Sequence, residues 1–251
     1  MATYVLSDIH GQYDLFTELL EKIQLKKTDT LYILGDALDR GPHPIRTLRK
    51  IMDMPNAVFL AGNHEQMAGE CLQLLMTEIT PETLLNLDRY TMESIINWRF
   101  NGSSTTIAEF SKLCMADRQA VLDFISEAPL YKELQVGDTK YLMVHAGLGN
   151  YDYDKPIEDY TEEELLWSRA DYNTCYYDDV YVVTGHTPTQ AIAENPDPGY
   201  IFRKNNHIAI DCGAYLPSGR LAAICLDTGE EYYSSSCSAK ASKEMEAVCD
   251  G

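Results

Sequence analysis

The sequence has 251 residues, of which 20 are basic and 39 acidic, so its formal net charge at pH 7 is −19. This length corresponds to one large domain or two small ones at roughly 150 residues per domain. The negative charge repels a phosphate backbone and an anionic lipid surface, which argues against nucleic-acid and membrane partners.

Three features lead us to expect a cytoplasmic protein. The first ten residues lack the basic and apolar regions of a secretory signal. No stretch approaches the ~20 apolar residues of a membrane span. The seven cysteines are scattered and include no CxxC pair, so we expect reduced thiols and neither a disulfide framework nor a cysteine-rich zinc site.

Residues 1–65 alternate between strand-like and helical patterns. Short apolar runs predict strands, and the spacing of Leu15, Leu19 and Ile23 predicts one face of a helix. The expected order is a strand at 3–10, a helix at 14–25, a strand at 30–36, a helix at 44–54 and a strand at 57–64. This alternation predicts βαβ units and a mainly parallel sheet.

Residues 66–130 carry only helical patterns, at 67–79, 81–100, 105–113 and 116–130. Strand patterns return at 131–137, 139–147, 180–187 and 206–214, and residues 220–233 predict a hairpin that turns at Thr228 and Gly229. We therefore expect a helical insertion between two groups of strands.

Five of the strand-like runs end in residues that can bind a metal. In chain order these residues are Asp8 and His10, Asp36, Asn63 with His64, His145, and His186. The carboxyl ends of strands in open α/β sheets converge on one crevice, so we expect these side chains to meet there. The set offers oxygen and imidazole ligands but no thiolate, which suits Mn, Fe or Zn better than Cu(I) or an iron–sulfur cluster.

These motifs, with the residues around them, resemble those of a known superfamily. The matching segments are Asp8–Gly11, Gly35–Gly41, Gly62–Glu65, His145–Gly147 and Gly185–Thr187. Together and in this order they resemble the calcineurin-like metallophosphoesterases. The pair Asp39-Arg40 resembles more closely the PPP-type serine/threonine protein phosphatases of bacteria and bacteriophages. The resemblance runs from residue 5 to about residue 233.

The resemblance implies an α/β fold in which two mixed sheets form a sandwich flanked by helices. We accordingly expect a metallophosphoesterase catalytic domain over residues 1–233, with its helical insertion at about 66–130. Residues 234–251 are polar and lack a periodic face, so we expect a flexible tail.

The resemblance also implies a site for two divalent metal ions, with Mn favoured and Fe or Zn as alternatives. The implied ligands are Asp8, His10 and Asp36 for the first ion, and Asp36 as a bridge with Asn63, His145 and His186 for the second. Two such ions lower the pKa of a shared water and clamp the attacking and leaving oxygens of an in-line displacement. A hydroxide bound to both metals is then the implied nucleophile.

Two further pairs of residues take roles by resemblance. His64 is the general acid that protonates the departing alkoxide, and Asp39 holds its imidazole and favours the protonated form. Arg40 and Arg169 are the implied phosphate clamps, because a guanidinium fork matches two phosphate oxygens. We expect Asp211 to support the site, and we do not expect His207 or His43 to be ligands.

The implied function is metal-dependent hydrolysis of phosphate monoesters, with phosphoserine and phosphothreonine in proteins as substrates. A symmetrical hydrolase of diadenosine tetraphosphate is the alternative enzyme, although such relatives tend to lack an acidic residue corresponding to Asp39. A catalytically inactive phosphopeptide-binding module is a third reading, which the intact ligand positions disfavour. A phosphorylated protein or a small phosphoester is therefore the expected partner.

Other phosphate and ester chemistries lack their motifs here. The sequence contains no GxxxxGK[ST], no GxGxxG after a strand, no cysteine followed six places on by arginine, and no GxSxG. One departure from the resemblance is Ser7, where glycine is more common before the Asp8 motif. We expect this change to leave the metals untouched.

Overall fold

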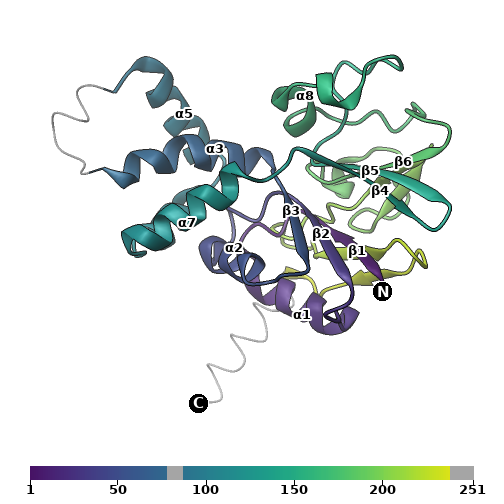
Figure 1. Ribbon diagram of the computed structural model, residues 1–251, viewed down its shortest axis with the longest axis horizontal. Coiled ribbons are helices and arrows are strands. Elements are labelled where there is room, and N and C mark those ends of the chain that lie inside the picture. Colours follow the sequence, from purple (N-terminus) through teal and green to yellow (C-terminus); the bar gives the residue numbers. More distant parts are fainter. Residues whose placement is uncertain (78–86, 238–251) are drawn as a thin grey trace.

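A computed structural model describes residues 1–77 and 87–237 of the chain. Its centre is a pair of five-stranded mixed sheets packed face to face, with helices on the outer sides (Figure 1). The expected α/β sandwich of two mixed sheets is confirmed. Among the helices of the described residues, none is long and apolar enough to span a lipid bilayer.

The first sheet has the strand order β10-β9-β1-β2-β3. Its strands, in this order, are Glu231–Tyr233, Ala222–Cys225, Thr3–Leu6, Thr30–Leu34 and Ala57–Leu60. β1, β2 and β3 are parallel, as the strand–helix alternation predicts, whereas β9 runs antiparallel to both β1 and β10. The predicted hairpin over residues 220–233 is confirmed as β9 and β10.

The second sheet has the strand order β4-β5-β6-β8-β7. Its strands, in this order, are Tyr131–Val136, Thr139–Val144, Val180–Thr184, His207–Ala209 and Phe202–Lys204. β5, β6 and β8 are parallel, and the two edge strands are antiparallel to their neighbours. The three-residue edge strand β7 was not predicted, because it is too short to show a periodic pattern.

Alternation along the strands divides the core into layers. Val5 of β1 packs between the sheets against residues such as Met143 and Val183, whereas its neighbours Tyr4 and Leu6 pack under the helices. Successive side chains of a strand point to opposite faces, so both faces of β1 are buried. The sheet therefore needs cover on its outer side, and the helices provide it.

The outer face of the first sheet is covered by α1 (Tyr13–Ile23) and α2 (Pro44–Met52). The outer face of the second sheet packs against the 3₁₀ helix η2 (Ile157–Asp159) and the short helix α8 (Glu162–Leu166). A further 3₁₀ turn, η3 (Thr189–Ala191), follows β6. These covers leave the carboxyl ends of the parallel strands as the place where loops from both sheets meet.

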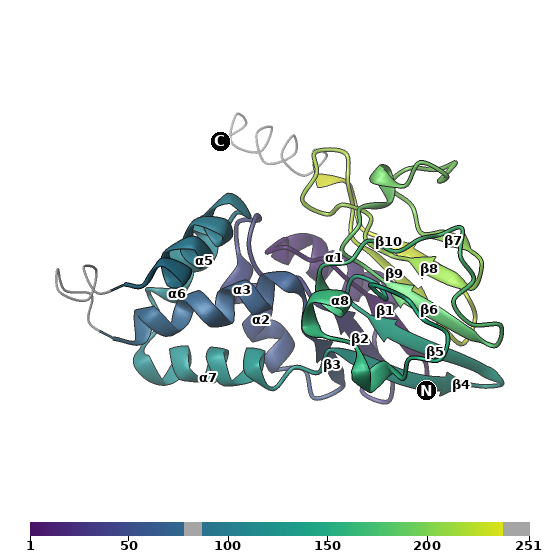
Figure 2. The ribbon, with the colours of Figure 1, turned by 90° about the horizontal axis from the view of Figure 1, so that it is seen from above.

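A group of helices lies between β3 and β4, at one end of the sandwich (Figure 2). Its members are α3 (Asn63–Leu72), η1 (Gln73–Met76), α5 (Arg89–Phe100), α6 (Ser104–Phe110) and α7 (Met115–Ser126). Within 66–77 and 87–130 no strand interrupts them. Residues 78–86, part of the predicted helical patterns, and residues 238–251 of the predicted tail lie outside the described residues.

The first of these helices begins earlier than its apolar pattern suggests. α3 starts at Asn63, four residues before the predicted helix, because the Glu65 carboxylate accepts a hydrogen bond from the backbone N–H of Gly62 at 3.1 Å. A carboxylate at the third helical position satisfies a free N–H group of the helix start in this way. Asn63 and His64 consequently lie on the first turn of a helix.

Candidate metal centre

The predicted site residues come from five parallel strands of the two sheets. Loops after β1, β2, β5 and β6, and the first turn of α3 after β3, bring nine of the ten into one network of contacts. The nine are Asp8, His10, Asp36, Asp39, Arg40, Asn63, His64, His145 and His186. The convergence expected at the strand ends is therefore observed.

Two glycines allow the loops to approach this closely. A Cβ atom on Gly62 would lie 2.3 Å from Oδ1 of Asp36, and one on Gly185 would lie 2.1 Å from Oδ2 of Asp8. Neither distance is compatible with a side chain, so the two glycines are required by the backbone packing around the two carboxylates.

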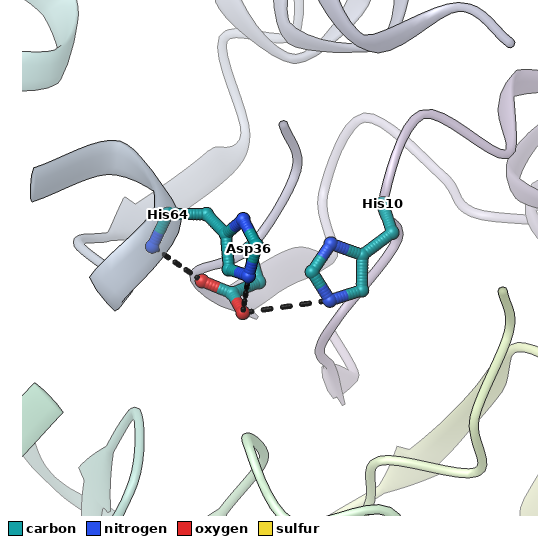
Figure 3. Close-up of side chains that lie close together, drawn as sticks. All are labelled: His10, Asp36 and His64. Carbon is teal, nitrogen blue, oxygen red and sulfur yellow. Dashed lines mark hydrogen bonds and ion pairs between the residues drawn. The ribbon is translucent and has the colours of Figure 1, made fainter. Parts of the chain in front are cut away.

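The first donor group consists of His10, Asp36 and His64, whose ligand atoms all lie within 4.8 Å of one another. Oδ2 of Asp36 is 3.5 Å from Nε2 of His10 and 3.8 Å from Nε2 of His64, so the carboxylate lies between the two imidazoles (Figure 3). Asp8 borders this group, with Oδ1 3.8 Å from Nε2 of His10.

The second donor group consists of Asp36, His145 and His186. Oδ1 of Asp36 is 3.4 Å from Nε2 of His145. Oδ1 of Asn63 lies 3.0 Å from Nε2 of His145 and 3.0 Å from Nδ1 of His186. Asp36 thus belongs to both groups, with one carboxylate oxygen facing each.

Hydrogen bonds fix which imidazole nitrogens are free of protons. Nδ1 of His10 donates to the carbonyl oxygen of Leu38 at 2.9 Å, and Nδ1 of His145 donates to that of Leu34 at 2.6 Å. In neutral imidazole each Nε2 is then a bare acceptor. Nε2 of His145 therefore faces two other acceptors, Oδ1 of Asp36 and Oδ1 of Asn63, an arrangement that a cation between them satisfies.

Burial keeps the imidazoles of His10 and His186 in the neutral form that binds metals, but it disfavours the ionised form of Asp36. Burial lowers the pKa of His10 well below its usual range, with the nearby positive charges of His64 and Arg40 adding to the effect. Burial likewise lowers the pKa of His186 to about 2, so both rings are neutral ligands. Burial raises the pKa of the Asp36 carboxyl well above its usual range, opposed by His64 and reinforced by Asp8. A bound cation offsets this cost of a buried carboxylate. The donor set fits divalent metal ions.

Asp8 is held by its own neighbours. The hydroxyl of Ser7 donates to Oδ2 of Asp8, and the backbone N–H of His186 donates to the same oxygen at 2.9 Å. Ser7, a departure from the resemblance that we expect to leave the metals untouched, thus directly contacts a predicted ligand, and its effect on the metals stays a prediction. A local motif does not reveal this contact, because it depends on how the Ser7 side chain, which also contacts the carbonyl oxygen of Leu34, is oriented after β1.

His64 has a carboxylate on one side and a guanidinium on the other. Its Nδ1 lies 2.7 Å from Oδ2 of Asp39, and its Nε2 lies 3.0 Å from Nη2 of Arg40. Nη1 of Arg40 is 3.1 Å from Nε2 of His10, and the guanidinium carbon lies 4.1 Å from the ring centroid of Tyr215. Arg40 thus brings a cation into the space where the imidazoles converge.

Arg169, the tenth predicted residue, lies at the edge of the network. Its Nη1 donates to Oγ1 of Thr187 at 2.9 Å, which ties it to the loop that carries His186. With Trp167 and Ser168 it lines a pocket of about 580 Å³. His207 and His43 lie outside both donor groups, in contact with Thr184 and Glu109 respectively. None of these residues bridges the two groups.

Two buried carboxylates support the site without belonging to either donor group. Glu65 accepts from the backbone N–H groups of Asp36 at 2.7 Å, Ala37 at 3.0 Å and Leu38 at 3.1 Å. It thereby fixes the loop after β2. Glu65 belongs to one of the sequence motifs, but its supporting role was not predicted. Its place at the third position of a helix is a capping signal that could have indicated it. Asp211 accepts from the backbone N–H of Gly213 at 2.8 Å, and burial raises its pKa.

Comparison with known proteins identifies the arrangement. The calcineurin-like phosphoesterase family matches residues 1–213. An asymmetrical bis(5′-nucleosyl)-tetraphosphatase of Halalkalibacterium halodurans is 27% identical over 88% of each chain. Serine/threonine-protein phosphatase 2 of Salmonella typhimurium is 25% identical over 72% of this chain and 86% of that one.

A solved structure, assigned as a diadenosine tetraphosphatase, has the same fold. It superposes with a TM-score of 0.66 at 16% identity and covers 94% of this chain and 93% of that one. The family match spans most of the 251 residues and includes all five site-bearing loops. The chain belongs to the calcineurin-like phosphoesterase family of metal-dependent hydrolases.

Proposed function

We propose that the protein hydrolyses phosphate monoesters, with phosphoserine and phosphothreonine residues of proteins as its substrates. The observation that carries this proposal is the pairing of His64 with Asp39 at 2.7 Å beside the shared carboxylate Asp36. An alkyl phosphate has a poor leaving group, and a positioned acid that protonates the alkoxide lowers the barrier to its departure. The Salmonella protein phosphatase among the relatives supports the same substrate class.

The family uses a dinuclear divalent metal centre. Its ligands would come from the two donor groups and from the adjoining Asp8 and Asn63, with His64 left free as the proton donor. Asp8, His10 and Asp36 would hold one ion, and Asp36, Asn63, His145 and His186 the other. When bound, such a pair stabilises negative charge and makes a water nucleophilic near neutral pH. The preference for Mn, with Fe or Zn as alternatives, is part of the proposal.

The chain's own residues supply orientation and the proton. Arg40, held over the ring of Tyr215, directs two guanidinium nitrogens toward the converging imidazoles, where phosphate oxygens would bind. Arg169 would hold a further phosphate oxygen from the rim. In this structure Nη2 of Arg40 donates to Nε2 of His64, so this contact would first have to be released and a proton taken up at Nε2. His64 would then give that proton to the ester oxygen as the bond to phosphorus breaks, while Nδ1 stays bonded to Asp39. The phosphoryl group passes directly to water, with no covalent enzyme intermediate.

Hydrolysis of dinucleoside tetraphosphates is the second candidate. It is favoured by the Halalkalibacterium relative, whose match covers more of this chain than that of the protein phosphatase. The leaving group of that reaction is a nucleotide phosphate, which departs without a proton donor far more easily than an alkoxide does. The paired His64 and Asp39 would then contribute little, and this argues for the monoester reaction.

The deciding experiment is product release from two substrates in the presence of Mn²⁺. A phosphothreonine peptide and diadenosine tetraphosphate are compared at equal concentration, each with a chelator control. Peptide turnover that the chelator abolishes supports the phosphatase proposal. Preferential cleavage of the dinucleotide overturns it, and the products then separate a symmetrical enzyme, which forms two ADP, from an asymmetrical one, which forms ATP and AMP.

A further inference from the structure

The carboxylate of Asp39 is bound mainly by the helices that follow α3. It is fully buried, and two side chains of this helical segment donate to it. Nε1 of Trp98, on α5, donates to Oδ2 at 2.7 Å, and the hydroxyl of Thr106, on α6, donates to Oδ1 at 2.5 Å. Oδ2 therefore accepts from both Trp98 and His64, and Oδ1 is occupied by Thr106.

The contact with Thr106 is reciprocal. Its hydroxyl donates to the carboxylate of Asp39 and accepts from the backbone N–H of the same residue at 3.0 Å. The next residue is tied to the same segment, because the N–H of Arg40 donates to the carbonyl oxygen of Gly102 at 3.0 Å. Asp39 and Arg40 both have left-handed backbones, with φ of 65° and 63°. Such a conformation persists only when its surroundings hold it.

These bonds leave Asp39 a single orientation toward the site. Each donor supplies a hydrogen bond to a polar group that is otherwise costly to bury. With one lone pair of Oδ1 taken by Thr106 and one of Oδ2 taken by Trp98, the carboxylate presents the second lone pair of Oδ2 to Nδ1 of His64. Nε2 of His64 then points toward Asp36 and the guanidinium of Arg40.

We propose that Trp98 and Thr106 are positioning residues that set the orientation of His64 through Asp39. The helical segment would thus determine how well the imidazole delivers its proton to a leaving alkoxide. This inference rests on the proposed monoester reaction, since only an alkoxide requires that proton. In the step itself the proton moves from Nε2 of His64 to the ester oxygen as the phosphorus–oxygen bond breaks, and His64 becomes neutral.

The test compares Thr106→Val and Trp98→Phe with the parent protein on two esters. General acids contribute roughly 10²–10⁴-fold in rate. We expect kcat on a phosphothreonine peptide to fall about tenfold in each variant, because a misoriented His64 retains only part of this contribution. On p-nitrophenyl phosphate, whose leaving group needs no proton, we expect little change. Equal losses on both esters, or no loss on either, contradict the inference, because a structural defect affects both alike.

Two matched variants separate positioning from packing. Thr106→Ser keeps the hydroxyl and should restore peptide turnover. Thr105→Val changes the neighbouring residue, whose hydroxyl is buried and has no hydrogen-bond partner among the described residues, and should leave both rates unchanged. A failure of Thr106→Ser to recover, or a loss in Thr105→Val as large as in Thr106→Val, would indicate a packing effect and overturn the inference.

A spectroscopic measurement keeps the inference separate from the proposed function. The Nδ1–H proton of His64, bonded to a buried carboxylate, should give a downfield ¹H resonance that is absent in His64→Asn. We expect it to shift upfield or exchange faster in Thr106→Val and Trp98→Phe, and to be unchanged in Thr105→Val. If the parent protein hydrolyses neither monoester, the proposed function fails, and this resonance alone decides on positioning. An unchanged resonance in both variants overturns the inference.

Discussion

The loops at the strand ends and the helical segment between β3 and β4 differ in backbone conformation and in which side chains they bury. In the loops, six non-glycine residues have positive φ angles between 47° and 65°, namely Asp8, His10, Asp36, Asp39, Arg40 and His186. Within 63–77 and 87–130 no non-glycine residue does. The buried side chains of the loops are largely polar, whereas α5 exposes Tyr90, Ile96 and Phe100 to solvent.

The difference indicates where each region gains its stability. Left-handed backbones cost free energy, of order 1–3 kcal/mol each, and persist where many contacts fix them. The loops therefore depend on hydrogen bonds between charged groups and backbone. The helical segment depends on local helix formation and on its buried apolar side chains, among them Trp98, which is 1% exposed. Substitutions should accordingly be severe in the loops and at the buried residues of the helices, and mild at the exposed positions of the helices.

The largest effect is expected at the carboxylate that both donor groups share. Asp36→Asn should abolish activity and weaken binding of both metals, because one residue serves both groups. The metal-free variant should unfold no more easily than the metal-free parent, since the substitution removes a buried carboxyl whose pKa burial raises. Metal content by mass spectrometry and denaturant unfolding measure the two effects. Retained metal with normal turnover would contradict a bridging role.

The next largest effect is expected at His64. His64→Asn should slow a phosphothreonine peptide by roughly 10²–10⁴-fold, the usual contribution of a general acid. Activated aryl phosphates should be affected far less, because their leaving groups depart without a proton. Steady-state kcat on a series of esters with graded leaving groups measures this. A uniform loss across the series would mean that His64 has another role.

The site could be read from the sequence because its residues stand at fixed places relative to strand ends. Asp36 and His145, for example, directly follow apolar runs, and such ends converge in an α/β sheet. The pairing of the strands into two mixed sheets came from the family resemblance, since periodicity alone predicts only that strands and helices alternate. The antiparallel strand β9 lies beside β1, and β10 beside β9, although β9 is about 220 residues from β1 in sequence.

Residues that act through tertiary contacts could not be read in this way. Trp98 and Thr106 appear in the sequence as ordinary members of helical patterns, yet both reach Asp39, 59 and 67 residues away. The contact of Ser7 with Asp8 was not predicted, because it depends on the rotamer of the Ser7 side chain. A pattern records which face of an element is buried, but it does not record which polar group lies opposite.

A third prediction concerns the support of the loop after β2. Glu65→Gln should destabilise the protein by about 2–4 kcal/mol, because an amide nitrogen replaces one of two oxygens and leaves buried N–H donors without acceptors. The midpoint of urea unfolding measures the loss. A loss below about 1 kcal/mol would show that the stability of this loop does not depend on its hydrogen bonds to Glu65.

A smaller effect is expected at Ser7. Ser7→Ala removes the hydroxyl that donates to Asp8, while the N–H of His186 still donates to the same oxygen. Groups that orient a metal ligand typically contribute 10–100-fold to affinity, and with one donor retained we expect about a tenfold loss. Titration calorimetry with Mn²⁺ measures it. Unchanged affinity would mean that the N–H of His186 is sufficient to orient Asp8.

The smallest effect is expected on the exposed face of α5, and it tests the helical side of the comparison. Phe100 is 87% exposed, and it lies two residues from Trp98, so the two side chains point about 200° apart on the helix. Phe100→Lys should change the free energy of unfolding by less than about 0.5 kcal/mol, as substitutions away from buried groups usually do. A positive charge in the last turn also suits the helix dipole.

Trp98→Phe, by contrast, should lower stability measurably in the same urea titration, because it opens space at a buried position. Equal losses in the two variants would mean that the exposed face of α5 contributes as much to stability as the buried Trp98 does.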